Sequence, residues 1–336
     1  RFAPLGEDGQ QRLSGSVALV VGCGALGSVI ANTLVRAGVG TVRIVDRDFV
    51  DLSNLQRQVL FDERDVERRM PKAVAAAERL RQINSEVAIE PVVADLSHEN
   101  IARLAKDAGV IIDGTDNFEA RLLINDYSVS TGTPWVYGGA VGGEGRVMAV
   151  LPGETACLTC LVPEPPAPGA MPTCDTAGVL GPTVNVVASL QSLEAMKILA
   201  GKRDAVVRDL MVVDVWSGRW RRLSVDNLHA AGTCETCHDR VFPWLEGERG
   251  GDADVLCGRN AVQLRPASPT AIDLPATAER LAGIGDVMAN PFLLRLAISA
   301  GGDDLEITLF ADGRAIVSGV DDPARARSLY AQYIGG

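Results

Sequence analysis

Histidine is scarce in this sequence, which has three histidines among 336 residues. None of them lies in a recognisable nucleophile–base motif, so histidine acid–base catalysis is not expected. The sequence also lacks a G-x-x-x-x-G-K-[ST] loop, which excludes ordinary P-loop hydrolysis. The formal net charge of −11 argues against a nucleic-acid or membrane partner, so any polyphosphate site must be locally basic.

Uninterrupted membrane-spanning runs are also lacking. The uncharged runs at 14–35 and 176–193 are long enough to raise the question, but Asn32 interrupts the first and Pro182 the second. Each run is better interpreted as a buried part of a soluble fold. Because no signal peptide is visible either, we expect a cytoplasmic protein.

The first half of the chain alternates strand and helix patterns. This alternation predicts an α/β fold with a Rossmann-like, doubly wound and mainly parallel sheet. Strands are expected at the start of 17–38 and at 41–46, 87–95, 109–116 and 134–141, and helices at the end of 17–38 and at 71–84 and 118–132.

The middle of the chain is rich in proline. Residues 162–174 carry five prolines, too many for a helix or an inner strand. We therefore expect an exposed crossover loop at about 162–178. A long helix is expected next at 183–201, and Gly201 ends it.

A second, smaller domain is expected at the end of the chain. Residues 246–254 are interpreted as a linker, and the patterns behind it predict a small α+β domain with a hairpin at Asp312-Gly313. The expected domains are 1–245, which includes the crossover loop, and 253–336. The small domain lacks an evident rhodanese-type cysteine loop, so its role is left open between docking a partner and stabilising a dimer.

A glycine-rich loop provides the first candidate site. Gly22, Gly24 and Gly27 form G-x-G-x-x-G between a strand and a helix, and Asp46 ends the next strand. Glycines let a phosphate approach the backbone, the helix amino terminus favours anions, and the acid can hold ribose hydroxyls. A tight strand–helix turn without a ligand is the alternative.

A run of amides and an arginine follows that acid. Asn54, Gln56 and Arg57 come 8 to 11 residues after Asp46, and Lys72 stands at the start of a helix. Such amides and cations can neutralise charge on a triphosphate during attack at phosphorus, for which hydride transfer has no comparable need. A solvated helix start with amphipathic arginines is the alternative.

Acidic residues follow the strand at 109–116. Asp116 and Asn117 lie at the end of a parallel strand, the edge where ligands bind in such sheets. A carboxylate there can hold magnesium, which suits ATP. Asp113 is an alternative metal ligand, and a helix cap is the stronger alternative for Asn117.

Four of the seven cysteines form two C-x-x-C pairs. Two such pairs indicate a structural, tetrahedral zinc site with no open position, whereas a redox pair is the alternative. His238 is a conceivable substitute ligand. Cys23 is expected to be a packing residue and Cys257 to be buried. The zinc ligands are Cys157, Cys160, Cys234 and Cys237.

The ordered set of motifs resembles the MoeB/ThiF family (HesA/MoeB/ThiF type), bacterial relatives of the ubiquitin-activating enzymes. The matching elements cover roughly residues 15–240 in family order. They are GCGALGS, the acid in IVDRD, DLSNLQRQ, the lysine in MPKA, DGTDN, TCDTAGVLGP and both C-x-x-C pairs.

The resemblance implies ATP-dependent adenylation of the C-terminal glycine of a ubiquitin-like sulfur-carrier protein ending in Gly-Gly, with release of pyrophosphate. It implies that Gly24 and Asp46 touch the nucleotide, that Asn54 and Arg57 lie by the phosphates, that Lys72 contacts them, and that Asp116 serves Mg²⁺.

The resemblance also assigns roles outside the nucleotide site. Cys174 resembles the crossover-loop cysteine that takes the activated partner or sulfur in some relatives; a spectator thiol is the alternative. A cysteine desulfurase or rhodanese is the expected sulfur donor. Family members are commonly homodimers, and an R-Y-x-R-Q segment ahead of this chain's "RF" carries an arginine that reaches the neighbouring subunit's ATP site.

Two other functions are kept as alternatives. An NAD-dependent oxidoreductase explains the glycine loop and Asp46 but leaves the SNLQR run, Lys72 and zinc without a role. A non-catalytic scaffold that binds a partner without activating it is the second alternative. The sequence does not name the pathway.

Overall fold

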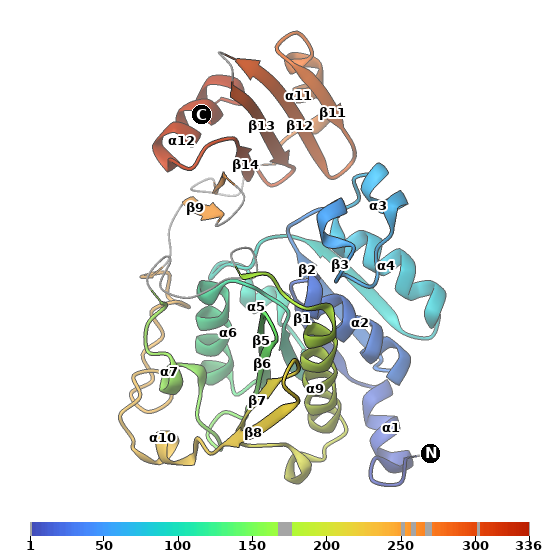
Figure 1. Ribbon diagram of the computed structural model, residues 1–336, viewed down its shortest axis with the longest axis vertical. Helices are drawn as coiled ribbons and strands as arrows, with labels where there is room; N and C mark the ends of the chain where they lie inside the picture. Colours follow the sequence, from blue (N-terminus) through green and yellow to red (C-terminus); the bar gives the residue numbers. More distant parts are fainter. Residues whose placement is uncertain are drawn as a thin grey trace. The chain divides into compact units, whose positions relative to one another are not determined.

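The computed structural model of the protein describes residues 2–166, 177–249, 253–256, 260–265, 271–300 and 303–335 (Figure 1). Internal contacts divide the chain into two compact units, Arg1–Arg249 and Gly250–Gly336. Each unit has its own sheet and its own hydrophobic core.

The first unit is built on an eight-stranded sheet in the order β3-β2-β1-β4-β5-β6-β7-β8. The strands from β3 to β5 in this order pair in parallel, whereas β6, β7 and β8 add on in antiparallel fashion. The expected mainly parallel, doubly wound sheet is thus confirmed. The strands are β1 (Val17–Val21), β2 (Thr41–Asp46), β3 (Ala88–Val93), β4 (Val110–Asp113), β5 (Trp135–Val141), β6 (Glu144–Val150), β7 (Leu210–Asp214) and β8 (Arg219–Leu223).

Helices cover both faces of this sheet. Successive residues of β1 point to opposite faces, so Val20 belongs to a core with α2, α4 and α9, and Leu19 to a core with α5 and α6. This double burial explains why the inner strands are almost continuously apolar. The helices are α1 (Gly6–Ser14), α2 (Ala25–Ala37), α3 (Glu63–Glu67), α4 (Lys72–Ile83), α5 (Ile101–Leu104), α6 (Phe118–Thr131), α7 (Leu158–Leu161), α9 (Gly181–Leu199) and α10 (Asp226–Ala230), with short 3₁₀ turns at Leu52–Asn54 and Arg203–Ala205.

The long helix α9 matches the helix expected at 183–201. It begins two residues earlier, because Pro182 fits the first helical turn, where its missing N–H costs nothing. Gly201 lies just beyond its end with a φ of +72°, a left-handed conformation that favours glycine. No helix of the described residues is long and apolar enough to cross a membrane.

The second unit is an antiparallel sheet in the order β11-β12-β13-β14-β10-β9, with two helices. The expected α+β class and the hairpin at Asp312-Gly313 are confirmed, since β13 and β14 pair on either side of that turn. The strands are β9 (Ala253–Leu256), β10 (Ala261–Leu264), β11 (Asp286–Ala289), β12 (Leu293–Ala300), β13 (Asp303–Phe310) and β14 (Ala315–Ser318), and the helices are α11 (Leu274–Leu281) and α12 (Pro323–Tyr333).

Candidate active site and metal centre

Three chain segments bring their expected site residues to one edge of the main sheet. In the register of the parallel strands, Val21 pairs with Val45 on one side and with Asp113 on the other. The segments that follow β1, β2 and β4 therefore leave the sheet together, at the carboxyl edge where α/β folds bind ligands. Figure 1 shows α2 and α6 starting from this edge.

The glycines of the loop differ in how closely neighbouring atoms surround them. A Cβ atom on Gly27 would lie 1.8 Å from the carbonyl oxygen of Gly22, so close packing requires glycine there. A Cβ atom on Gly24 would come no closer than 3.8 Å to a neighbour, the Nε2 of Gln58. Gly24 directly precedes helix α2, so the loop leaves open space at a helix amino terminus.

Asp46 is fixed at the end of β2 by backbone donors. Its carboxylate accepts a hydrogen bond from the backbone N–H of Cys23 at 2.6 Å and from that of Asp48 at 2.7 Å. Burial raises the pKa of Asp46, although the positive charge of Lys72 opposes the shift. The carboxylate is thus held against the glycine loop, on the side where the sequence predicts a ribose.

Lys72 is buried and ion-paired. It starts α4, its backbone N–H donates to the carbonyl of Asp48 at 2.9 Å, and its Nζ lies 3.1 Å from Asp48 Oδ2. Asp48, which the sequence reasoning did not single out, therefore holds Lys72 beside Asp46. The D-x-D spacing in IVDRD was the signal that could have identified it.

The amide–arginine run is more ordered than a solvated helix start. Asn54 is buried, and its Oδ1 accepts a hydrogen bond from Gln58 Nε2 at 2.8 Å. Arg57 is half-buried and donates to the carbonyl of Ser53 at 3.2 Å, whereas Gln56 is exposed. Gln58 was also missed, although it follows Asn54 by one helical turn; its Nε2 is the neighbour nearest to a Cβ atom on Gly24.

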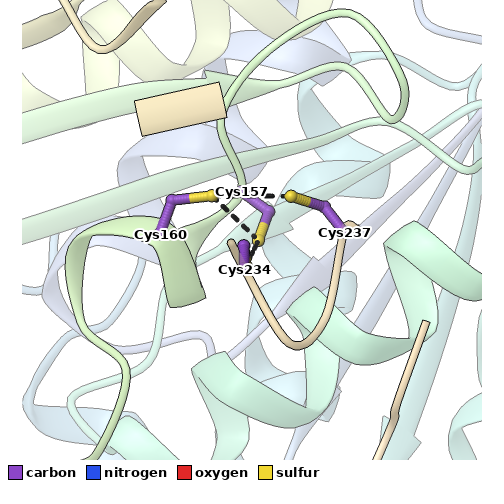
Figure 2. A group of neighbouring side chains, drawn as sticks. All are labelled: Cys157, Cys160, Cys234 and Cys237. Atoms are coloured by element: carbon purple, nitrogen blue, oxygen red, sulfur yellow. Dashed lines mark hydrogen bonds between the residues drawn. The ribbon is translucent and has the colours of Figure 1, made fainter. Parts of the chain in front are cut away.

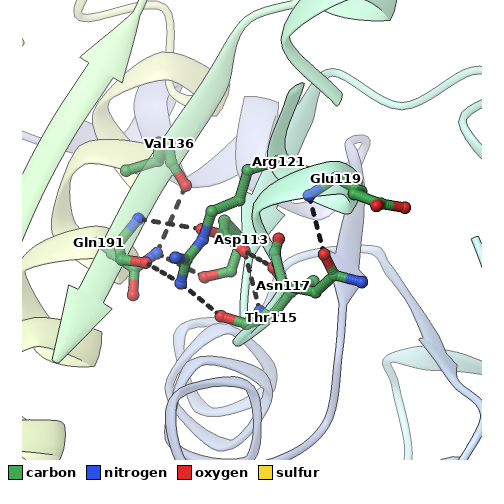
Figure 3. A network of polar contacts seen from close by, with 8 residues as sticks. Asp113, Thr115, Asn117, Glu119, Arg121, Val136 and Gln191 are labelled. Carbon is green, nitrogen blue, oxygen red and sulfur yellow. Dashed lines mark hydrogen bonds and ion pairs between the residues drawn. The ribbon is translucent and has the colours of Figure 1, made fainter. Parts of the chain in front are cut away.

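Both carboxylate oxygens of Asp113 are bonded by neighbouring groups of the protein (Figure 3). Its Oδ2 pairs with Arg121 Nε at 2.9 Å, and its Oδ1 accepts from the backbone N–H and the hydroxyl of Thr115. Arg121 also donates to the carbonyls of Thr115 and Gly138. Burial lowers the pKa of Arg121, but the charge and hydrogen bond of Asp113, together with Tyr137 and Asp116, outweigh burial and raise the pKa, so the guanidinium stays protonated.

The turn after β4 leaves one carboxylate exposed. Asn117 caps α6, since its Oδ1 accepts from the backbone N–H of Glu119 at 2.8 Å, as the helix-cap alternative expected. The side chain of Asp116 is exposed at the same edge. Because Asp113 is occupied by Arg121 and Thr115, Asp116 is the carboxylate of this turn with oxygens that face solvent.

The four cysteines of the two C-x-x-C pairs converge on one point (Figure 2). Their sulfur atoms all lie within 4.8 Å of one another, with contacts of 3.8, 3.6 and 3.5 Å. Tetrahedral zinc with Zn–S bonds of about 2.3 Å places its sulfurs about 3.8 Å apart, so the cluster fits zinc. The thiol contacts lower the pKa of Cys157 and Cys234 and raise the pKa of Cys160 and Cys237, so two of the four thiols are favoured as the thiolates that zinc binds.

The other cysteines have separate outcomes. Cys23 is completely buried, and burial raises its pKa far above the ordinary value, which confirms a packing role. Cys174, most of the expected crossover loop, and Cys257 lie outside the described residues. The described parts of the expected crossover loop, 162–166 and 177–178, contain no strand and a single helical residue.

Comparison with known proteins assigns this arrangement to a family. The ThiF family matches residues 1–236. The sulfur carrier protein ThiS adenylyltransferase of Bacillus subtilis is 46% identical over 99% of this chain and 97% of its own length. The sulfur carrier protein adenylyltransferase of Thermus thermophilus is 38% identical over 70% of this chain and 87% of its own length.

A solved structure supports the fold independently. Escherichia coli MccB is 20% identical, covers 70% of this chain and 68% of its own chain, and superposes with a TM-score of 0.60. Sequence, fold and matched length agree, and the chain belongs to the ThiF family.

Proposed function

We propose that this protein is an adenylyltransferase that uses ATP to activate the C-terminal glycine of a ubiquitin-like sulfur-carrier protein. The similarity to the Bacillus subtilis ThiS adenylyltransferase, which extends over 99% of this chain, carries the proposal. The edge at which the glycine loop, Asp46, Lys72 and Asp116 meet supports it physically, because it combines an anion site with a carboxylate suited to a divalent cation.

In the proposed reaction a carboxylate oxygen of the partner attacks the α-phosphorus of ATP. A new O–P bond forms, the bond from the α-phosphorus to the bridging oxygen breaks, and pyrophosphate leaves. The nucleophile is already an anion, so no general base is required. The residues proposed to bind the nucleotide are Gly22, Gly24, Gly27, Asp46, Asn54, Gln56, Arg57, Lys72, Asp116 and Asn117.

The cationic residues would act on the phosphates. Arg57 and Lys72 would stabilise the charge that develops as pyrophosphate leaves, since preorganised donors are most effective where water is excluded. Lys72 is suited to this role because it is buried and held by Asp48. Asp116 would hold Mg²⁺, which supplies a further positive charge against the triphosphate.

The partner and its later reactions are proposals of the same kind. The adenylated glycine would pass to a sulfur donor such as a cysteine desulfurase or rhodanese, or to Cys174. A homodimer acting in the cytoplasm is proposed from the family resemblance, and the four-cysteine cluster is proposed to hold structural zinc. The antiparallel C-terminal unit is proposed as a separate domain at about 253–336.

The decisive experiment is partner-dependent exchange of labelled pyrophosphate into ATP, with a ubiquitin-like protein ending in Gly-Gly from the same genome. We expect exchange that falls at least about 100-fold in Lys72→Ala and Asp116→Ala, because each removes a charge beside the reacting phosphates. Asp204→Ala is the matched control, since Asp204 is an exposed carboxylate away from the sheet edge.

The two alternatives give different results in the same samples. ATP binding without exchange in the presence of the partner would favour the non-catalytic scaffold. Binding of NADH but not of ATP would favour the oxidoreductase. The names of the relatives favour the adenylyltransferase over both.

A further inference from the structure

The two cysteine pairs share a feature beyond their spacing. Both read C-x-T-C, so a threonine stands directly before the second cysteine of each pair, Thr159 in the first and Thr236 in the second. The hydroxyl oxygens of these threonines lie 3.0 Å apart, although the residues are 77 positions apart in the sequence. The two cysteine loops are therefore joined by a hydrogen bond that does not involve a metal.

Adjacent residues of α6 hold one cysteine loop each. Asn125 accepts from the backbone N–H of Leu158 at 2.7 Å and donates from Nδ2 to Thr159 Oγ1 at 2.9 Å. Asp126 accepts from the hydroxyl of Thr236 at 3.4 Å and from the backbone N–H of Trp244 at 3.0 Å. Asn125 and Asp126 are completely buried.

This burial makes the network energetically consequential. Buried amide and carboxylate groups are costly unless they are hydrogen-bonded, so removing one member leaves the others unsatisfied. The segment after the second pair adds another tie, because Arg240 donates to the carbonyl of Ser130 at the end of α6 at 3.2 Å. The helix thus holds both cysteine loops by side chains that are not themselves metal ligands.

We propose that Asn125, Asp126, Thr159 and Thr236 form a polar clamp that positions the two cysteine pairs and sets how tightly the protein holds zinc. The clamp keeps the loops at sulfur distances suited to zinc before the metal arrives, so less ordering has to accompany binding. This inference concerns metal retention and does not depend on the adenylation reaction.

The clamp also joins the metal centre to the sheet edge. Asn125 follows Arg121 by four residues, so the two side chains lie on the same face of α6, one turn apart. Arg121 holds Asp113 at the end of β4, and Asn125 holds the first cysteine loop. Loss of the metal should therefore loosen α6 and the turn from which it starts.

The test compares zinc release from zinc-loaded variants of the full chain, measured with a chromogenic chelator. Thr159→Val/Thr236→Val removes both hydroxyls, and we expect release about 10- to 100-fold faster than from the wild type. Thr159→Ser/Thr236→Ser keeps the hydroxyls and should restore slow release. Thr33→Val is the matched control, because Thr33 bonds within α2 and touches neither cysteine loop.

The single variants sharpen the result. Because Thr159 and Thr236 share one hydrogen bond, their single effects on release should not add up to that of the double variant. Wild-type release from the folded double valine variant would overturn the clamp. If that variant does not fold, Thr159→Ala at its half-buried position replaces it, and unchanged release would overturn the clamp equally.

Discussion

At the scale of single residues, Gly24 and Gly27 of the same loop have different structural roles. Gly27 is required by close packing, because a Cβ atom there would overlap the carbonyl of Gly22. Gly24 has no such neighbour, and its missing side chain leaves space beside a helix amino terminus. The motif G-x-G-x-x-G does not distinguish these roles, which depend on how β1 and α2 pack.

Gly24→Ala should therefore weaken ATP binding at least about tenfold, because an added methyl group takes the space that a phosphate would need. Gly24→Ala should also lower the free energy of unfolding much less than Gly27→Ala does. Titration calorimetry with ATP and urea unfolding measure the two quantities. Equal loss of stability in the two variants would contradict this division of roles.

Asp126 is a buried carboxyl group with a perturbed titration. Burial raises its pKa from the ordinary 3.8 to about 6, so the folded state prefers the neutral acid. Between these two pH values the folded state binds more protons than the unfolded state. The contribution of Asp126 to the free energy of unfolding is thus largest below pH 4 and falls as the pH rises through 6.

Asp126→Asn removes this titration and keeps the size of the side chain. Relative to this variant, the wild type should lose on the order of 2 to 3 kcal/mol of stability between about pH 4 and pH 7. Urea unfolding of the metal-free forms of both proteins across that range measures the difference, in which the shared cysteines cancel. A difference that stays constant with pH would contradict the raised pKa.

At the scale of elements, α6 does more than cover a face of the sheet. Asn117 caps its start, Arg121 ends its first turn, and the residues that hold the cysteine loops follow one turn later. Arg121 and Asp113 form a buried pair, and breaking such a pair leaves an uncompensated charge in the interior.

Arg121→Met should lower the free energy of unfolding by about 3 to 5 kcal/mol, because Asp113 would keep a buried charge without its partner. Arg103→Met on the exposed side of α5 should change stability by less than about 0.5 kcal/mol. Urea unfolding compares the two variants. A loss below about 1 kcal/mol in Arg121→Met would show that Thr115 alone satisfies Asp113.

The parallel elements were predictable from sequence, whereas much of the rest was not. Continuous apolar runs such as β1 and β4 signal strands buried on two faces, and the glycine turn marks the start of α2. By contrast, β8 reads RWRRL, is exposed along its length and lacks a clear alternation, so nothing in the sequence predicted it. The role of Arg121 arises from a tertiary contact that no spacing reveals. Asp48 and Gln58 had only weak signals, a D-x-D spacing and a position one helical turn after Asn54.

The cysteine cluster and the proposed nucleotide site could be predicted from the sequence to different extents. Two C-x-x-C pairs predict a four-sulfur cluster because two such pairs in one chain rarely arise except to bind a metal. The cluster is present. For the nucleotide residues, the motifs predict a common sheet edge, which parallel topology provides. Which of the acids faces solvent depended on Arg121, whose long side chain reaches back eight residues to Asp113.

On the scale of the whole molecule, the protein consists of two units with separate cores. The ThiF family match ends at residue 236, inside the first unit. The Thermus thermophilus relative matches 70% of this chain with 87% of its own length. The residues proposed to bind the nucleotide and the four cysteines of the cluster all lie in that unit.

Residues 1–249 alone should therefore fold, retain zinc and bind ATP as tightly as the full chain. Calorimetric titration with ATP and metal analysis of the purified fragment provide the measurement, and the Gly24→Ala version of the fragment is the negative control. Loss of ATP binding by a folded fragment would assign part of the nucleotide site to the second unit.

The cysteine cluster also closes a ring in the chain. Cys157 and Cys234 are 77 residues apart, so a bound metal turns the polypeptide between them into a loop with both ends tied. By the entropy of loop closure, such a tie raises the free energy of the unfolded state by about 4.5 kcal/mol as long as the metal stays bound. Helix α9, strands β7 and β8 and the crossover segment all belong to this ring. Loss of the metal would thus release this constraint on about a quarter of the chain.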